Sequence, residues 1–436
     1  MSHSKAVPLM KPRLSAQQTF SALRHPNYRL WFAGQLVSLV GTWMQTTAQG
    51  FLVFELTHSP AYLGYVGFAA GLPSWLFMLY GGVAADRISR RKLLIITQTA
   101  MMIMAGILAG LTFAGWVRPW HIILLAFGFG VANAFDAPTR LAFVLEMVSR
   151  DDLTNAIALN STMFNAATAI GPAAAGITYA LLGPAWCFAV NTISFIAVII
   201  ALVLMKLKPL PARSRQNSIL ADVKSALKYA ASQTIVRTVI LNLAAVSLFG
   251  MGFVTLMPAW AVNVLGGDAT TNGLLQSARG IGALAGALMV AALSHLNIRG
   301  KLLTIGSFAF PSLLLVFSTI RWLPLSLLAL VGLGWGMMVM MNSSNALVQI
   351  QVPDNLRGRV MSIYSLTFFG LMPVGSLLAG AFASRFGEPL TVALASGALL
   401  FAATLAFVGV PALRKDQEVT DHPPDGPALD QGRDMD

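Results

Sequence analysis

Cysteine and charge are both scarce in this sequence of 436 residues. The single cysteine, Cys187, cannot form an intramolecular disulfide. Only 11% of the residues are charged, whereas 56% are hydrophobic. This balance excludes an ordinary soluble domain.

Signatures of metal, nucleotide and covalent chemistry are missing as well. The six histidines do not cluster at ligand spacing, no phosphate-binding loop is present, and no nucleophile is paired with a base. The glycines from Gly280 to Gly286 resemble a dinucleotide loop, but their spacing is wrong and no strand comes before them. We therefore expect no cofactor, no metal and no enzymatic activity. Energy must come from an ion gradient or from the substrate's own gradient, unless another subunit supplies ATP.

Acidic residues are fewer than basic ones, 17 against 29, which gives a formal net charge of +12 at pH 7. A charge of this sign is typical of nucleic-acid binding. The basic residues, however, lie in short segments between long apolar runs, where they orient a membrane protein and contact anionic lipid headgroups. The sequence therefore favours a lipid bilayer over nucleic acid as a partner.

Long apolar runs are what the sequence has in abundance. A helix of about 20 residues crosses roughly 30 Å of hydrocarbon, and helices are the natural spanning structure because lipid offers no partners to a bare peptide group. We therefore expect an all-α polytopic membrane protein with twelve transmembrane helices. The runs are Leu30–Phe54, Tyr62–Ala85, Leu93–Gly115, Trp120–Phe143, Thr154–Leu182, Ala185–Met205, Thr238–Asn263, Asn272–Ser294, Leu302–Ile320, Leu325–Ile350, Arg359–Ser384 and Leu390–Pro411.

The basic residues also orient the chain. With the N-terminus in the cytoplasm, the outer segments contain only Arg118, Arg321 and Arg385, and Arg140 and Arg279 lie within runs. All other lysines and arginines are then cytoplasmic, as the positive-inside rule requires. We expect a multi-pass protein of the cell membrane with both termini in the cytoplasm.

The two halves of the chain resemble each other at a nearly constant offset. In one block, 209 positions separate Gly64, Gly71, Arg90 and Lys92 from Gly273, Gly280, Arg299 and Lys301. In a second block, 204 positions separate Gly171, Gly176 and Gly183 from Gly375, Gly380 and Gly387. A duplication of six spans is the layout of a secondary transporter whose halves rock around a site at the middle of the membrane.

The longest interior polar stretch, Lys206 to Arg237, separates six runs from six. Its Leu220–Tyr229 portion is expected to form an amphipathic helix on the membrane, and the tail is expected to be disordered. The expected division is a cytoplasmic N-terminal segment at 1–29, an N-terminal six-helix bundle at 30–205, a cytoplasmic linker at 206–237, a C-terminal six-helix bundle at 238–411 and a disordered cytoplasmic tail at 412–436.

The loop between the second and third runs carries a family pattern. Residues Gly82–Lys92 read GVAADRISRRK. This stretch resembles the signature G-x-x-x-D-R-x-G-R-R/K between the second and third spans of the major facilitator superfamily, with Ser89 in place of the second glycine. The resemblance covers about Arg24 to Pro411 and implies two pseudo-symmetric six-helix bundles.

Further segments resemble one bacterial branch of that superfamily. They are His25–Gly64, Asn133–Arg140, Leu153–Ser161 and Ile170–Pro172. The branch contains the enterobactin exporter and related transmembrane secretion effectors. The resemblance implies proton-driven export of siderophores or other small amphiphilic molecules across a bacterial inner membrane.

The loop Gly82–Lys92 is expected to act as a cytoplasmic gate. In one conformation Asp86 would face the positive N-terminal dipole of the eleventh span, near Gly358. The resemblance suggests an ion pair between Arg90 and Glu146 at the cytoplasmic end of the fourth span. The alternative is that these charges only set the topology. The expected gating residues are Gly82, Asp86, Arg87, Arg90 and Glu146.

Asp136 is the only acidic residue well within a run, where charge is costly and usually functional. Asn133, Asp136 and Arg140 share one face of the fourth helix, and the last two are spaced for an ion pair. We expect protonation of Asp136 to change its pairing with Arg140 during transport; the alternative is a static bridge. Glu55 is the next candidate for the coupling proton. The tenth run repeats the spacing without charge, in Asn342, Asn345 and Gln349.

Polar residues inside the runs are expected to line a central substrate cavity, because lipid would leave their amides unpaired. The first run carries a stripe made of Gln35, Ser38, Thr42, Gln45 and Gln49. The other candidates are Asn133, Asn165, Arg279, Asn342 and Asn345. The alternative for the stripe is hydrogen bonding between helices, and for Arg279 it is snorkelling outward.

Gly171, Pro172 and Gly176 partly resemble a glycine-rich signature of exporters in the fifth span. Small residues allow close contact between helices, and Pro172 permits a bend. Ordinary helix packing is the alternative role for these three residues.

These features predict a secondary active transporter, namely a proton-coupled exporter of small amphiphilic molecules that works by alternating access. Its partners are a small-molecule substrate, protons and the lipid bilayer, and a monomer is the simplest assembly. The alternatives are an uptake symporter, or a membrane receptor or scaffold that transports nothing.

Overall fold

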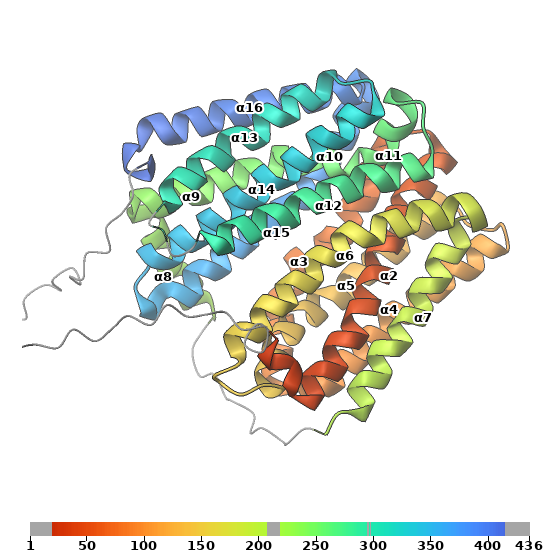
Figure 1. Ribbon diagram of the computed structural model, residues 1–436, viewed down its shortest axis with the longest axis horizontal. Helices are drawn as coiled ribbons and strands as arrows, with labels where there is room; N and C mark the ends of the chain where they lie inside the picture. Colours follow the sequence, from red (N-terminus) through yellow and green to blue (C-terminus); the bar gives the residue numbers. More distant parts are fainter. Residues whose placement is uncertain (1–19, 207–218, 294–295, 297, 415–436) are drawn as a thin grey trace, which may run out of the picture.

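The computed structural model describes residues 20–206, 219–293, 296 and 298–414, and within these ranges every regular element is a helix (Figure 1). The prediction of an all-α protein is therefore confirmed. Six long helices make up the first half: α2 (Pro26–Thr57), α3 (Pro60–Arg87), α4 (Arg90–Phe113), α5 (Pro119–Phe143), α6 (Leu153–Leu182) and α7 (Pro184–Leu204). Two short 3₁₀ turns accompany them, η1 (Ser21–Arg24) and η2 (Val144–Glu146).

The second half begins with α8 (Ile219–Ser232), the amphipathic helix expected in the linker, and residues 207–218 of that linker lie outside the described residues. A chain of short elements then forms the seventh span: α9 (Thr234–Ala245), η3 (Val246–Gly250), α10 (Gly252–Thr255), α11 (Met257–Ala259) and η4 (Trp260–Val264). The remaining helices are α12 (Ala269–Ala292), α13 (Arg299–Thr319), α14 (Leu323–Gln351), α15 (Asp354–Phe386) and α16 (Glu388–Gly409), followed by the turn η5 (Pro411–Arg414).

Proline and glycine define many of the helix ends. Six long helices, α2, α3, α5, α7, α14 and α16, carry proline at their first or second position, where its fixed φ suits a helix start and its missing N–H costs nothing. At the other end, α6 stops at Gly183 (φ 90°) and α15 stops at Gly387 (φ 78°). Positive φ favours glycine, so these two residues separate α6 from α7 and α15 from α16.

Nine helical segments in the described part of the chain are long and apolar enough to cross a membrane. The helices α2, α3 and α6 are not among them, although they contain 32, 28 and 30 residues. With these three included, the observed helices are consistent with twelve crossings, and each of them overlaps one of the apolar runs found in the sequence.

The seventh span is the irregular one. Two π-helical turns, η3 and η4, interrupt it, and Pro258 is the second residue of the short helix α11 between them. A π-helical turn leaves the ordinary i to i−4 hydrogen-bond ladder, and such turns are frequent at functional sites. The hydroxyl of Ser247, within η3, donates a hydrogen bond to the carbonyl of Phe368 in α15.

The helices form two groups, α2–α7 and α8–α16, which lie side by side (Figure 1). The groups meet mainly along two pairs of helices, α3 with α15 and α6 with α12. The start of α2 and the end of α16 lie at the same end of the molecule (Figure 1). An even number of crossings requires this placement.

Aromatic side chains fill the interior of each group. In the second group Trp260 stacks on Phe317 with ring centroids 4.4 Å apart, and in the first group the edge of Trp31 meets Phe143 at 5.6 Å. On the outside, large apolar side chains such as Leu181 and Phe401 are exposed. An exposed apolar belt of this kind suits contact with lipid chains rather than water.

Candidate functional site

Glycines bring the two groups of helices into contact. A Cβ atom on Gly64 of α3 would lie 2.9 Å from the carbonyl oxygen of Ser376 and 3.2 Å from the Cα of Gly380, both in α15. A Cβ atom on Gly273 of α12 would lie 2.5 Å from the carbonyl oxygen of Pro172 and 3.0 Å from the Cα of Gly176 in α6. A glycine of the first repeat block therefore faces a glycine of the second block at each of two equivalent interfaces.

Gly71 and Gly280, the next matching glycines of the repeat, also have equivalent surroundings. Gly71 of α3 packs against Pro373 of α15, and Gly280 of α12 packs against Thr168 and Ala169 of α6. Within the groups, Gly171 packs against Trp43 of α2, and its counterpart Gly375 packs against Ser247 and Leu248 of the seventh span. The segment Gly171–Gly176 is thus a helix-packing element on two sides, toward α2 and toward α12.

The close contacts between the groups occupy one end and the middle of the interface. Along α3 and α15 they run from Gly64 and Gly380 to Trp75, which packs against Gly370. Toward the other end, a Cβ atom on Gly82 or on Gly358 would have no described atom within 4 Å. The end that the charge pattern predicts to be extracellular is therefore the one at which the two groups are packed together.

The loop between α3 and α4 carries an ion pair. Arg90 Nη1 donates to Glu146 Oε1 at 2.8 Å and lies 3.4 Å from the carbonyl oxygen of Ala142, which ties the start of α4 to the end of α5. Arg87 is exposed, and Gly82 is half-buried. The side chain of Asp86 lies outside the described residues, so its expected contact with the start of α15 is not described either.

Asp136 is buried in a polar network between α4 and α5. Its Oδ1 accepts hydrogen bonds from Thr97 Oγ1 at 2.9 Å and from Gln98 Nε2 at 2.8 Å. Its Oδ2 lies 3.7 Å from Arg140 Nε and has no hydrogen-bond partner in the described part of the chain. The network lies within the first group of helices, and the neighbouring Asn133 is half-buried.

The polar stripe of the first span mostly faces other helices. Gln35, Ser38, Gln45 and Gln49 are all buried. Gln45 Oε1 accepts a hydrogen bond of 2.7 Å from Asn191 Nδ2 in α7, which is the interhelical contact considered as the alternative to a cavity role. Thr42 is half-buried, and its hydroxyl donates to the carbonyl of Ser38 in its own helix.

The remaining amide candidates make local hydrogen bonds. Asn165 donates to the carbonyl of Ser161 in α6 at 2.9 Å. In α14, Gln349 Nε2 donates to Asn345 Oδ1 at 2.5 Å, and Asn342 and Asn345 are both half-buried. These residues are therefore spread over α6 and α14 and are not joined to the network of Asp136.

Arg279 differs from every other charged residue in the spans. Its side chain is 7% exposed, so it does not snorkel to the surface, and its Nε has no hydrogen-bond partner among the described residues. No ion pair joins it to a carboxylate within the ranges that the structure describes. Gln276 and Asn272, one and two turns earlier in α12, are also buried.

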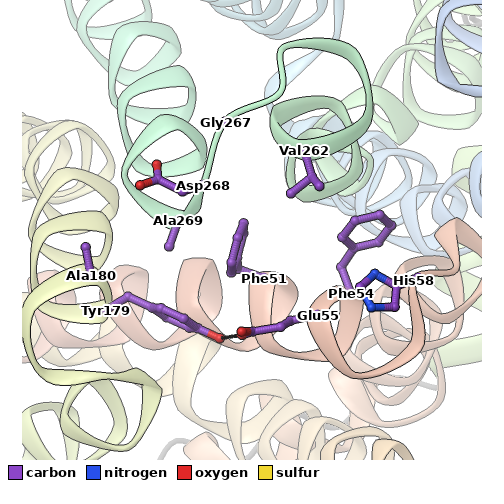
Figure 2. Close-up of a pocket in the computed structure, with 10 residues that line it drawn as sticks. All are labelled: Phe51, Phe54, Glu55, His58, Tyr179, Ala180, Val262, Gly267, Asp268 and Ala269. Carbon is purple, nitrogen blue, oxygen red and sulfur yellow. Dashed lines mark hydrogen bonds between the residues drawn. The ribbon is translucent and has the colours of Figure 1, made fainter.

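A pocket of about 310 Å³ lies where both groups meet at the ends of α2 and α6 and the start of α12 (Figure 2). Tyr179 of α6 donates a hydrogen bond to Glu55 of α2 at one side of it. Asp268 lies across the pocket and accepts from the Thr271 backbone N–H at 2.9 Å, which caps α12. The lining residues are Phe51, Phe54, Glu55, His58, Tyr179, Ala180, Val262, Gly267, Asp268 and Ala269.

Several of these polar partners were not predicted from the sequence. Thr97, Gln98, Asn191 and Tyr179 all complete contacts of predicted residues, but each lies on a different helix from its partner. The available signal was only that these residues are polar within apolar runs. Their pairing depends on how each helix is rotated, which the spacing along a single helix does not determine.

Solved structures with the same fold are all-helical membrane transporters. The chain matches a bacterial homologue of the human lysosomal transporter Spinster, solved in an inward-facing and unoccupied conformation, over 93% of its own length and 100% of that chain, with a TM-score of 0.66 and 14% identity. It matches the nucleoside transporter NupG over 88% of its own length and 98% of that chain, with a TM-score of 0.68 and 14% identity. The fold is therefore that of the major facilitator transporters.

Sequence comparison then shows the family. Residues 17–434 match the family model described as transmembrane secretion effector, and the chain belongs to this family. The expectation drawn from the loop between α3 and α4 and from the further matching segments is thereby confirmed. The protein is a multi-pass membrane transporter of the major facilitator superfamily.

Characterised relatives match most of the chain. The staphyloferrin A transporter of Staphylococcus aureus is 26% identical over 82% of this chain and 90% of its own length. The enterobactin exporter EntS of Salmonella typhimurium is 24% identical over 86% of this chain and 89% of its own length. The multidrug efflux pump Tap of Mycolicibacterium fortuitum is 26% identical over 90% of this chain and 97% of its own length.

Proposed function

We propose that this protein exports small amphiphilic molecules of the siderophore or drug class across a bacterial inner membrane and that protons drive the export. The observation that carries the proposal is the near full-length similarity to transporters named for a siderophore or for drugs. The membrane-transporter fold and the buried carboxylate of Asp136 support it.

Alternating access is the proposed mechanism. The two groups of helices have equivalent contacts, Gly64 with Gly380 and Gly273 with Gly176, and they are packed closely at one end and in the middle of the interface. Rocking about this pseudo-symmetric interface would open the packed end and close the other one. The two termini and the loop of Arg90 are proposed to lie on the cytoplasmic side, because nearly all basic residues fall there.

Asp136 is proposed to carry the coupling proton. Protonation at Oδ2 would remove the attraction to Arg140, while Oδ1 could keep its hydrogen bonds from Thr97 and Gln98. The carboxylate is thus held in place by one oxygen and is free to change its interaction at the other. A group with this arrangement can respond to the proton gradient without losing its position.

Flux in sealed everted vesicles tests the proposed function. A panel of siderophores and amphiphilic drugs would be offered with and without an imposed pH gradient, using vesicles that lack the protein as the control. Accumulation inside everted vesicles that depends on the gradient is the expected result. Movement only in the opposite direction would indicate an uptake symporter, and binding without any flux would indicate a receptor; either result would contradict the proposal.

A further inference from the structure

One face of α12 carries a row of buried hydrogen-bond donors. Asn272, Gln276 and Arg279 follow each other at helical spacing, and they are 0%, 7% and 7% exposed. Gln276 Nε2 donates to Asn272 Oδ1 at 3.2 Å, so Asn272 uses its acceptor within the row. The Nδ2 of Asn272 and the Nε of Arg279 have no hydrogen-bond partner in the described ranges. The row therefore offers free donors with no acceptor to meet them.

The packing of α12 shows that this row faces the interior. Gly280 faces α6, whereas Gly282 and Gly286 pack against Val331 and Trp335 of α14. The row lies between these two contact faces of α12. The opposite face carries the exposed side chains Leu274, Ile281 and Leu288 and is the one suited to lipid. The donors thus lie where α12 meets both α6 of the other group and α14 of its own group.

The row also lies at a suitable depth. Arg279 follows Ala269, the first residue of α12, by ten positions. At 1.5 Å per residue, it lies about 15 Å along the helix, which is near the middle of a hydrocarbon layer roughly 30 Å thick. Substrate sites of transporters built from repeats lie near this depth, at the interface between the repeats.

A buried arginine without a carboxylate needs an explanation. An unpaired charge in the hydrocarbon region is costly, and such residues face the interior and mark substrate pathways. The planar guanidinium binds planar oxyanions through two parallel hydrogen bonds, and an adjacent amide N–H can bind the same group. A carboxylate on the bound molecule would supply the acceptors that this row lacks.

We propose that Asn272, Gln276 and Arg279 form the subsite that binds a carboxylate of the transported molecule, so that the protein prefers amphiphilic acids over their neutral counterparts. The inference rests on the proposed function, because it names the substrate class of that transport site. Arg279 supplies the charge and the paired donors, and Asn272 adds the unpartnered amide. The apolar remainder of the molecule would extend along the interface between the groups.

A matched set of ligands and variants tests the subsite. The probes are amphiphilic carboxylic acids, each paired with its methyl ester, which keeps the carbon skeleton and removes the charge. Binding to the purified protein is measured by the shift in unfolding temperature, and transport is measured separately in everted vesicles. The variants are Arg279→Gln, Arg279→Lys and Gln276→Leu. Arg385→Gln is the control, because it removes the same charge at an exposed position in the last turn of α15.

The wild type and Arg385→Gln should bind acids at least tenfold more tightly than esters. Arg279→Gln should lose this preference, whereas Arg279→Lys and Gln276→Leu should keep a reduced one. Equal binding of acid and ester by the wild type would overturn the proposal. If Arg279→Gln does not fold, Arg279→Lys and Gln276→Leu decide the question, and an undiminished preference for the acid in both of them would also overturn the proposal. Competition by phosphatidylglycerol that abolishes acid binding would assign the row to a lipid headgroup and overturn it too. Acid-selective binding without any flux would instead contradict the proposed export and leave the subsite standing.

Discussion

Gly64 and Gly380 lie against each other at the interface of α3 and α15, and Gly273 and Gly176 do the same at the interface of α12 and α6. Each contact joins one glycine from the first sequence block to one from the second. The pseudo-symmetry visible in the chain is therefore the symmetry of the surface on which the two groups of helices meet. Backbones can approach this closely only where no Cβ atom separates them.

Substitution of Gly64 tests this contact. Gly64→Leu would place side-chain atoms where Ser376 and Gly380 lie, at a cost of about 1–3 kcal/mol for overpacking. The conformation with this end packed should lose population by about fivefold or more. The distribution of distances between spin labels at the start of α3 and the end of α15 measures this population.

Gly397→Leu in α16 is the matched control, because a Cβ atom on Gly397 has no described atom within 4 Å. The control should leave the distribution of distances unchanged. An unchanged distribution in Gly64→Leu as well would mean that the contact does not hold the groups together.

The ion pair between Arg90 and Glu146 should contribute to stability. Glu146→Gln removes the charge from a pair whose side chains are 23% and 15% exposed, and a hydrogen bond to a charged group contributes about 1.5–3 kcal/mol. The unfolding temperature in detergent should therefore fall. The control is Asp354→Asn, which removes a pair with Arg357 whose side chains are 88% and 44% exposed.

A surface pair of that kind contributes about 0–1 kcal/mol, so Asp354→Asn should have little effect. Equal losses in the two variants would show that Glu146 is no better paired than a surface carboxylate. Arg90 and Glu146 both lie in the first group of helices, so the expected effect is on the stability of that group.

How far the sequence predicts this structure depends on the kind of feature. Helix positions follow from the length of the apolar runs and from residues such as Pro60 and Gly183, because span length and backbone freedom are local properties. The breaks in the seventh span were not predicted, although Pro258 is visible in the sequence. A π-helical turn such as η3 depends on contacts with α15, which lies far away along the chain.

The candidate site was predicted less completely than the fold. The acid Asp136 and its partner Arg140 share one helix, so their pairing could be anticipated from spacing. The partners Thr97 and Gln98 lie on α4, and Gln45 is bound by Asn191 of α7 rather than left facing a cavity. The rotation of each helix about its axis decides these contacts, and packing of the whole bundle sets that rotation.

The hydrogen bond between Gln45 and Asn191 should be structural. Gln45→Leu leaves the buried Asn191 amide without its acceptor, and interhelical hydrogen bonds in membrane proteins contribute about 0.5–2 kcal/mol. The single variant should be destabilised by about this amount, and the double variant with Asn191→Leu by less than the sum of the two single variants. Thermal unfolding of the four proteins measures the coupling. A change in substrate KM with no loss of stability would instead place Gln45 in the transport pathway.

The N-terminal turn η1 is attached to the start of α6 by a contact that depends on pH. Two hydrogen bonds lower the pKa of Asp152 below its ordinary value of 3.8; the one from Ser21 has the larger effect and the one from His25 the next. His25 Nε2 lies 2.7 Å from Asp152 Oδ2. Because the folded state holds the ionised carboxylate, its stabilising effect is complete well above pH 3.8 and is lost as the pH falls through the lowered pKa.

The difference in unfolding temperature between the wild type and Asp152→Asn should therefore be present at about pH 5 and should shrink at lower pH. Comparing the two proteins at each pH removes the contribution of the other carboxylates. Asp151→Asn, the neighbouring exposed acid, is the control and should show no such dependence. A difference that does not shrink below about pH 5 would contradict the contact.

Asp136→Asn should separate transport from the proton gradient. The amide keeps the size of the carboxylate and an oxygen for Thr97 and Gln98, but it carries no charge for Arg140 and cannot be deprotonated. In proteoliposomes with an imposed pH gradient, the variant should lose uphill accumulation and still let substrate equilibrate down its own gradient. Thr97→Val is the companion variant: it removes one hydrogen bond, costs about 1 kcal/mol of stability and should stay coupled. If Asp136→Asn is folded and still accumulates substrate uphill, Asp136 is a structural partner of Arg140, and Glu55 becomes the next group to test.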